Sequence, residues 1–409
     1  MPNSIHPMKN TFFGAGCWAL ALLCNVGSSM AATPLLPTSD GQVIEKLAIA
    51  THRQNPSAGT PNVSDAASAA KQAIAQARSA GDTRYWGRAQ AILAPWWDAQ
   101  NAPIEIAILQ ATVQQGRHEF ALAYATLGKA LKRDPNNAQA WLIEASLDRL
   151  AGRYTEALHA CEAVGHAGQP WYAQSCRLET RSLQGQWAQA RTGFAVLLAT
   201  AQNTAQSAWV WSLLAESEER AGNVAAATDA YTQSLAHSDD LYTRLAYADL
   251  LLRTTPAAPS PTAQAQWKRV LKVLAAAPET DAVLLRRALA MQGLGQTDAW
   301  HAIRIELAGR AEALKSRGDD TTLHAREAAL AALWLDDKPE KATELALQNL
   351  QMQKEPIDWW VALQSARSAH QPQTIAQIQK AVQAIGLKDT RLAPVGVPRS
   401  DHPNRIALQ

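Results

Sequence analysis

Alanine-rich helical segments alternate along this chain with short turns that contain glycine. The stretch from Asn137 to Val164 shows the repeating unit, since it predicts two short helices joined at Gly152. Similar turns occur at Gly81, Gly116, Gly185 and Gly222. Successive glycines in this series are 35, 36, 33 and 37 residues apart. Because a period in the thirties with two helices per unit is typical of helical repeat arrays, we predict an all-α fold of stacked helix pairs.

Several residues within these units match a known repeat pattern. The second unit closes with Ala-Leu at 130–131 and Asp-Pro-Asn-Asn at 134–137. The third carries Trp141, Ala145, Gly152, Tyr154 and Ala157, and the fifth carries Trp211, Leu214, Ala215, Gly222, Ala227 and Tyr231. In this pattern the chain resembles the tetratricopeptide-repeat (TPR) family. Residues 77–97 also look like a segment of secreted bacterial TPR proteins that have no assigned activity.

The resemblance implies a right-handed superhelical solenoid of TPR-like pairs. Small residues where paired helices cross, such as Ala145 with Ala157, let the two backbones approach closely. Some positions depart from the family pattern. Arg177 in the fourth unit, and Glu144 and Asp148 in the third, stand where the pattern has apolar side chains. We therefore expect diverged repeats.

The chain divides into five parts under this interpretation. We expect a leader at 1–31, an irregular arm at 32–63, TPR-like repeats at 64–237, diverged helix pairs continuing the solenoid at 238–386 and a flexible tail at 387–409. About nine helix pairs are predicted, with Ser64 as the N-cap of the first helix. No single pair can bury its apolar face alone, so the pairs must stack.

The overall charge gives no support to a polyanionic partner. The 409 residues include 38 Lys and Arg against 36 Asp and Glu, which gives a formal net charge of +2. Binding to nucleic acid or to an anionic membrane through bulk electrostatics requires a marked excess of basic residues. We therefore predict no nucleic-acid partner.

The N-terminus has the pattern of an export signal. Lys9 precedes an apolar run from Thr11 to Val26, and small residues follow at Ser29 and Ala31. This order predicts a signal peptide that is cleaved after Ala31. The alternative is a membrane anchor, for which the apolar run is short, since a spanning helix needs about 20 residues. We expect a periplasmic or secreted protein without stable membrane insertion.

Two cysteines, Cys161 and Cys176, remain after the predicted cleavage. An even number of cysteines in an oxidising compartment predicts a disulfide, here between the second helix of the third pair and the first helix of the fourth. Free buried thiols are the main alternative. His159 and His166 lie nearby, but the spacing matches no common zinc site, so we predict no metal and no cofactor.

No segment carries a pattern that predicts catalysis. The sequence contains no nucleophile elbow, and HAREAAL at 324–330 lacks a second histidine four residues after the first. The glycines of GLGQTD at 293–298 are better explained by a helix-ending turn than by a phosphate-binding loop. We predict no catalytic residues.

The resemblance also implies where a partner binds. In the TPR family a concave groove takes a protein or peptide, and fixed positions of the first helix of each pair line it. Those positions here include Gln139, Arg149, Tyr172, Glu179, Trp209, Ser212, Glu216, Glu219 and Arg220. An aromatic side chain beside hydroxyls and mixed charges suits an extended peptide. A solvated inner face without a ligand is an equal alternative, because every solenoid has such a face.

These features together predict a non-catalytic periplasmic scaffold that binds a protein or peptide partner. Two alternatives stay open. One is an enzyme or carbohydrate-binding protein with a cleft in the diverged C-terminal pairs. The other is a structural protein that forms homo-oligomers through its terminal repeats. The sequence does not predict an oligomeric state.

Overall fold

The computed structural model describes residues 62–256, 258–316, 318 and 325–393. The expected leader at 1–31, the expected arm up to residue 61 and the end of the expected tail, 394–409, lie outside these residues. The described residues belong to one compact unit that begins at Thr60. Their regular secondary structure is entirely helical.

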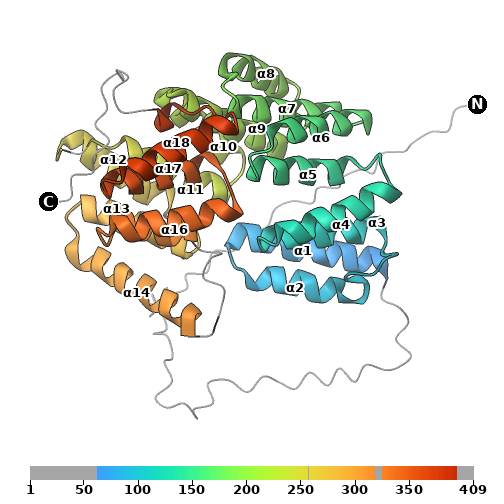
Figure 1. The fold of residues 1–409 in the computed structure, drawn as a ribbon, viewed down its shortest axis with the longest axis horizontal. Coiled ribbons are helices and arrows are strands. Elements are labelled where there is room, and N and C mark those ends of the chain that lie inside the picture. The colour runs from blue at the N-terminus through green and yellow to red at the C-terminus, as the bar shows by residue number, and fades with distance from the viewer. Residues whose placement is uncertain (1–61, 257, 317, 319–324, 394–409) are drawn as a thin grey trace, which may run out of the picture. The chain divides into compact units, whose positions relative to one another are not determined.

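The eighteen α-helices of the described residues form nine consecutive pairs, as the sequence predicts (Figure 1). The first helix of each pair is called the A-helix. The A-helices are α1 Val63–Ala80, α3 Ile104–Gly116, α5 Ala138–Leu150, α7 Pro170–Leu183, α9 Thr204–Ala221, α11 Leu241–Thr254, α13 Asp281–Gly293, α15 Ala325–Trp334 and α17 Pro356–Ser368. The second helix of each pair is called the B-helix. The B-helices are α2 Arg84–Leu93, α4 Phe120–Arg133, α6 Tyr154–His166, α8 Trp187–Ala199, α10 Val224–His237, α12 Pro261–Val273, α14 Thr297–Ser316, α16 Pro339–Met352 and α18 Pro372–Ala384. Two short 3-10 helices are η1 Ala94–Trp96 and η3 Thr390–Leu392.

Each A-helix packs against its own B-helix, and most B-helices pack against the next A-helix. The small residues predicted at the crossings are fully buried, with 0% exposure at Ala145 and Ala157 in the third pair and at Ala215 and Ala227 in the fifth. Because these side chains end at Cβ, the two backbones can approach closely. The described helices therefore form the predicted TPR-like pairs, and the alternation of A- and B-helices continues through the diverged pairs α11 to α18.

Larger side chains fill the space between successive pairs. Phe194 of α8 is fully buried in a cluster with Val210 and Leu213 of α9. Tyr231 of α10 stacks on Tyr247 of α11, with ring centroids 5.6 Å apart. Each of these aromatic residues buries apolar surface that one helix pair could not cover alone.

The glycine turns have the left-handed backbone that favours glycine at four of the five predicted positions. The φ angles are 60° at Gly81, 74° at Gly152, 88° at Gly185 and 85° at Gly222. The turn predicted at Gly116 joins α3 to α4, but Gly116 is itself the last residue of α3, and His118 has the positive φ of 61° in that turn. Gly116 instead faces Trp86, where an added Cβ atom would overlap the indole ring.

The first helix begins at Val63, and its N-cap is Asn62, two residues before the predicted N-cap Ser64. The Oδ1 atom of Asn62 accepts a hydrogen bond from the backbone N–H of Ser64 at 2.9 Å. Asn137 and Asn203 cap α5 and α9 in the same manner. These side chains satisfy N–H groups that have no partner inside the helix.

The predicted disulfide joins Cys161 of α6 to Cys176 of α7, and the two Cα atoms lie 5.5 Å apart. Both residues are buried, and the two helices pack side by side. The bond therefore links the third pair covalently to the fourth.

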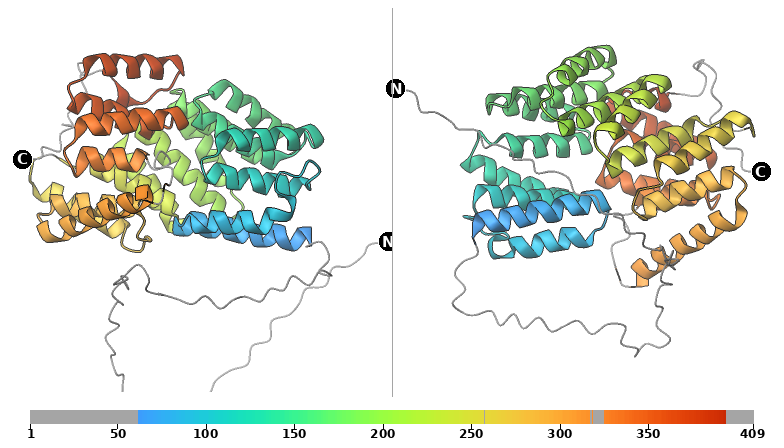
Figure 2. Two further views of the ribbon diagram at one scale, coloured as in Figure 1. Left: turned by 60° about the horizontal axis from the view of Figure 1, so that its bottom comes forward. Right: turned by 180° about the vertical axis from the view of Figure 1, so that it is seen from behind.

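Two sets of contacts connect segments that lie far apart in the sequence. The end of α1 meets the starts of α11 and α13, so that an added Cβ atom on Gly81 would lie 2.6 Å from Thr280 and 3.0 Å from Leu241. The C-terminal helices lie beside the middle of the chain (Figure 2). One large core cluster accordingly extends from Tyr154 to Leu392.

Residues 387–393, which we expected to belong to a flexible tail, are packed. Leu387 and Leu392 are only 3% and 6% exposed, and Arg367 donates a hydrogen bond to the carbonyl oxygen of Ala393 at 2.8 Å. The expectation rested on the prolines of this region, which begin at Pro394. The two leucines come before that point, and burial of their side chains stabilises the segment.

Candidate functional site

The predicted partner-binding residues lie on α5, α7 and α9. We call the side of these helices that carries them, together with the corresponding side of α11, the A-face. It has two edges. The start edge consists of residues near the starts of the A-helices: Gln139, Tyr172 and Tyr242 lie in a first turn, and Trp209 lies in the second turn of α9. The turn edge consists of the ends of α5, α7 and α9, next to Gly152, Gly185 and Gly222.

Aromatic rings line the start edge. The ring centroids of Tyr172 and Trp209 are 6.0 Å apart, with an interplanar angle of 31°, and Trp171 contributes a third ring 6.0 Å from Trp209. The side-chain amide of Gln206 donates a hydrogen bond to the Tyr172 hydroxyl at 3.2 Å. Tyr172 and Trp209 are half-buried, whereas Tyr242 is 54% exposed. The rings thus hold one another in place and still offer accessible aromatic surface.

Charged side chains occupy the middle of the A-face. Arg149 and Glu179 form an ion pair with 3.0 Å between Nη2 and Oε2. Arg220 lies 3.5 Å from Glu216, and the Tyr242 hydroxyl donates a hydrogen bond to Glu216 at 2.8 Å. The side chains of Glu179 and Glu216 keep 21% and 20% of their surface exposed. Solvent, or a ligand, can therefore reach both carboxylates.

Glu216 changes its charge close to neutral pH. Burial raises its pKa to about 7, although Arg220 and the hydrogen bond from Tyr242 act in the opposite direction. The nearby carboxylates of Glu179 and Glu355 add to the rise. Like charges in a partly desolvated site favour the protonated form. The charge of the A-face therefore depends on pH in the neutral range.

The turn edge is occupied by the chain itself. The carbonyl oxygen of Leu150, at the end of α5, accepts a hydrogen bond from the backbone N–H of Lys354 at 2.7 Å. At the end of α7, the carbonyl oxygen of Leu183 accepts one from the backbone N–H of Lys388 at 2.8 Å. The last carbonyls of a helix have no partner within it, so these contacts satisfy groups that would otherwise need water.

The three glycine turns of the turn edge face residues 385–391, which we call the C-terminal segment. An added Cβ atom would lie 3.3 Å from Ile385 at Gly152, 3.0 Å from Lys388 at Gly185 and 3.2 Å from Thr390 at Gly222. Each successive turn thus meets a later residue of the segment. The segment runs across three consecutive pairs, and glycine leaves room for it at each crossing.

Glu219 anchors the far end of this segment. It forms ion pairs with Arg253 of α11 and with Arg391 of η3, and it accepts a hydrogen bond from the Tyr231 hydroxyl at 3.0 Å. Although burial alone would raise its pKa, Arg253, Arg391 and Tyr231 together hold the pKa of Glu219 below its ordinary value. The carboxylate therefore stays ionised in the interior.

The nine predicted residues fall into three environments. Gln139 is exposed and Tyr172 and Trp209 are half-buried at the start edge. Glu179, Ser212 and Glu216 lie in the middle. Arg149, Glu219 and Arg220 lie in the last turns of α5 and α9 at the turn edge, where Glu219 and Arg220 are buried. Glu219 and Arg220 already have partners within the chain, since Arg220 donates to the Ser182 hydroxyl at 2.7 Å. The role of the nine residues in binding stays a prediction.

Two residues of the A-face were not predicted from the sequence. Tyr242 has a local signal, because it follows Leu241 at the start of the next A-helix, much as Trp209 follows Ala208. Glu355 comes from the connection between α16 and α17 and reaches Glu216 only through the tertiary fold. No local pattern identifies such a residue.

Two buried donors below the A-face make no hydrogen bond within the described residues. They are the Tyr154 hydroxyl and the Nε atom of Arg220, and both residues are 3% exposed. Burial raises the pKa of Tyr154, and Arg220, Arg149, Asp389 and Glu355 are the charges close enough to affect it.

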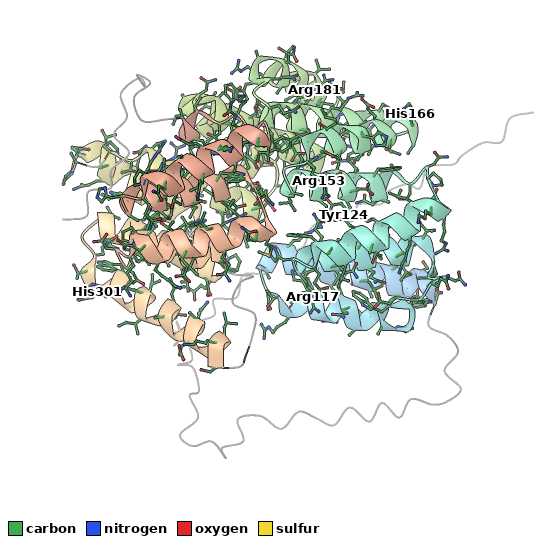
Figure 3. All side chains as sticks on the ribbon, in the orientation of Figure 1. Arg117, Tyr124, Arg153, His166, Arg181 and His301 are labelled. Atoms are coloured by element: carbon green, nitrogen blue, oxygen red, sulfur yellow. A yellow bond between two sulfur atoms is a disulfide. The ribbon has the colours of Figure 1, made fainter. Side chains whose placement is uncertain are left out.

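Other charged side chains pair with one another around a buried partner. Arg286 pairs with Asp249 and Glu327, each at 2.7 Å. Tyr124 and Arg153 point toward each other between α4 and the turn before α6, with the guanidinium 4.6 Å from the ring centroid, and both contact Asp148 (Figure 3). These side chains satisfy one another, so we assign them to the stability of the fold.

The described residues contain neither a cluster that could hold a metal ion nor a helix that could span a membrane. No group of three or more His, Cys, Asp or Glu side chains is arranged to hold a metal ion. None of the described helices combines the length and the apolar character that crossing a membrane requires.

The sequence matches no protein-family model. It also has no significant match among curated proteins. Solved structures with distant similarity include a chain of the APC/C hetero-tetramer Cut9–Hcn1, with 15% identity, a TM-score of 0.41, and coverage of 72% of this chain and 54% of that chain. Others are a tetratricopeptide repeat protein from Parabacteroides merdae, with 14% identity, a TM-score of 0.37, and coverage of 59% and 93%, and the P58(IPK) TPR domain, with 15%, 0.22, 80% and 94%.

This chain therefore matches only about half the length of the Cut9–Hcn1 chain. Because these likenesses are distant, the TPR-like assignment rests on the helix pairs and glycine turns described above.

Proposed function

We propose that this protein is a non-catalytic scaffold of the cell envelope that binds an extended segment of a partner protein along the start edge of the A-face. The observation that carries this proposal is the series Tyr172, Trp209 and Tyr242, in which three successive A-helices each present an aromatic ring. Aromatic side chains dominate protein-binding hot spots because they bury a large area at a low cost in conformational entropy.

The middle of the A-face supplies polar groups that suit a peptide. The Arg149–Glu179 pair and Glu216 are partly accessible, and they can contact side chains of either charge. This combination favours a polypeptide over a purely apolar ligand.

A location outside the cytoplasm is part of the proposal. It is supported by the export-signal pattern of residues 1–31 and by the disulfide between Cys161 and Cys176. Disulfides persist in oxidising compartments such as the bacterial periplasm and are rare in the cytosol.

Site-specific photo-crosslinking in intact cells tests the proposal. A benzophenone amino acid replaces Tyr242 or Gln139 at the start edge, and Val196, which is 61% exposed on B-helix α8, gives the matched control. We expect one discrete adduct from both start-edge positions, its loss when Trp209→Ala is added, and no adduct from position 196. An adduct that forms equally at all three positions, or that ignores Trp209→Ala, would contradict the proposal.

A further inference from the structure

The B-helices α10 and α12, together with α11, form a groove of about 630 Å³ (these helices are labelled in Figure 1). Leu235 of α10 and Tyr247 of α11 contribute to its apolar part, and Tyr247 is buried. The basic side chains of Lys268, Arg269 and Lys272 all come from α12. No Asp or Glu occurs among the described residues that line the groove. The groove therefore combines an apolar interior with one positively charged wall.

The positive charge of this wall is not matched within the described residues. None of its three basic side chains has an ion pair with any of them. The carboxylates on the adjoining connections, Asp239 and Glu279, are paired with Arg244 and Arg287. Asp229 of α10 is outside the lining, and a positive excess would remain even if it were counted. The wall can therefore attract an anionic ligand by charge complementarity.

The requirements of the helix itself do not explain all three charges. Lys272 is in the last turn of α12, where the helix dipole favours a cation. Lys268 and Arg269 lie in the middle of the helix, where the dipole gives no such advantage. Lys268 and Lys272 are also four residues apart, a spacing at which like charges destabilise a helix. A ligand that brings negative charge would offset this repulsion.

Arg269 is held in place by the apolar part of the groove. Its guanidinium carbon lies 5.3 Å from the ring centroid of Tyr247. That ring stacks on Tyr231 with centroids 5.6 Å apart, and its hydroxyl oxygen is 3.3 Å from the hydroxyl oxygen of Thr232. A guanidinium presents its N–H groups as a planar fork that matches a carboxylate. Arg269 can therefore bind a carboxylate with little further loss of conformational freedom.

The size of the groove and the spacing of its lysines indicate an extended peptide. An inorganic anion would fill only a small part of about 630 Å³. Lys268 and Lys272 are one helical turn apart, which corresponds to about 6 Å along the helix axis. Alternate side chains of an extended chain point the same way and are about 6.6 Å apart. Two carboxylates at alternate positions can thus meet both lysines, and the residue between them points toward the opposite wall.

We propose that the groove between α10 and α12 binds an extended acidic segment of a partner protein. Carboxylates at alternate residues of this segment pair with Lys268 and Lys272, and a further carboxylate binds Arg269. An apolar residue between two carboxylates packs on Leu235. The B-helices carry the charges and the apolar wall, so this surface is distinct from the A-face, and the proposal does not rest on the function assigned above.

Fluorescence anisotropy with rhodamine-labelled peptides tests the proposal on the mature protein. The probe contains Asp-Leu-Asp-Leu-Asp between Gly-Ser spacers, and the matched peptide contains Asn-Leu-Asn-Leu-Asn. We expect the Asp peptide to bind at least about tenfold more tightly, because Asn keeps the shape and removes the charge. Lys268→Glu combined with Lys272→Glu should abolish this preference. Arg269→Lys should weaken binding of the Asp peptide about threefold, because lysine keeps the charge and loses the planar fork.

Lys129→Glu combined with Lys132→Glu is the matched control. It changes the net charge by the same amount at exposed positions of α4, outside the groove, and should leave binding unchanged. Failure of the Asp peptide to bind, equal binding of the Asn peptide, or equal losses in the two double variants would overturn the proposal. Trp209→Ala should leave peptide binding intact, so the result is independent of the A-face.

Two other occupants of the groove are outcomes of the same test. Vesicles of phosphatidylglycerol that bind the wild type but not the Lys268 and Lys272 double variant, without binding of the Asp peptide, would assign the surface to an anionic membrane. Self-association that this double variant abolishes in sedimentation velocity would assign it to a second copy. Either result would overturn the proposal.

Discussion

The two edges of the A-face belong to the same helices but have different surroundings. At the turn edge, the carbonyl oxygens of Leu150 and Leu183 and the carboxylate of Glu219 are bound by Lys354, Lys388 and Arg391 of the chain's own C-terminal part. At the start edge, Tyr172, Trp209 and Tyr242 contact mainly one another and their helix neighbours.

In this repeat fold, one edge of a surface contributes to stability and the other edge is available for recognition. The turn edge offers backbone carbonyls and glycine, which any extended polypeptide can contact, and the protein fills it with residues 385–391. The start edge offers aromatic side chains, whose identity depends on the sequence of each helix. Changes at the turn edge should therefore affect folding, and changes at the start edge should affect binding.

Glu219→Ala should have the largest effect on stability. The substitution leaves Arg253, whose side chain is 7% exposed, without a carboxylate, whereas Arg391 keeps its ion pair with Asp389. Removing one partner of a buried ion pair typically costs about 3 to 5 kcal/mol. Urea unfolding of the mature protein measures the free energy. Glu162→Ala, at an exposed position on α6, is the control and should change it by less than about 0.5 kcal/mol. A loss below about 1 kcal/mol for Glu219→Ala would contradict the assigned role.

The Glu216→Gln variant should have a higher free energy of unfolding than the wild type at about pH 8, and this advantage should disappear at about pH 4. Because its pKa is about 7 in the folded protein and 4.5 ordinarily, Glu216 takes up a proton on folding between these values, and its contribution to stability falls as pH rises from about 4.5 to about 7. The variant should therefore gain up to about 3 kcal/mol relative to the wild type between about pH 4 and about pH 8. Unfolding at both pH values measures the gain, and a difference that is independent of pH would refute it.

Gly185→Ala should cost more than Gly168→Ala. Both glycines have positive φ, 88° and 80°, so alanine strains the backbone at either position by about 1 kcal/mol. Only at Gly185 does the new Cβ meet another segment, Lys388 at 3.0 Å, while Gly168 has open space. We expect an additional loss of about 1 kcal/mol at Gly185 in urea unfolding. Equal losses would mean that the C-terminal segment does not pack on this turn.

Tyr242→Ala should have the smallest effect on stability and a clear effect on binding. Its ring is 54% exposed and its hydroxyl makes one hydrogen bond, to Glu216, so the loss in unfolding free energy should be about 1 kcal/mol. Binding of the partner identified by crosslinking from Gln139 should weaken at least about tenfold, as expected for an aromatic hot spot. A large loss of stability with unchanged binding would reverse the roles assigned to the two edges.

The helix pairs could be predicted from the sequence because their signals are local. The glycine spacing, the alanines at 145 and 157 and the cysteines at 161 and 176 each report on residues within one or two helices. The nine pairs and the disulfide follow from such patterns. Gly116 shows the limit of such local signals, because a glycine is needed there for close contact with Trp86 and not for a left-handed turn.

The division of the A-face could not be predicted in this way. Glu219 and Arg391 are 172 residues apart, and no local pattern relates them. Leu387 and Leu392 are too few to mark a packed segment, and the prolines that follow suggested a tail.

Hydrogen exchange of the purified mature protein reports whether Lys354 and residues 385–391 occupy the turn edge in solution. If they do, the amides of Lys354 and Lys388, which donate to Leu150 and Leu183, exchange as slowly as those of the surrounding A-helices. Exchange at the rate of an unstructured peptide would show that the turn edge is open, and the A-face would then offer both edges to a partner.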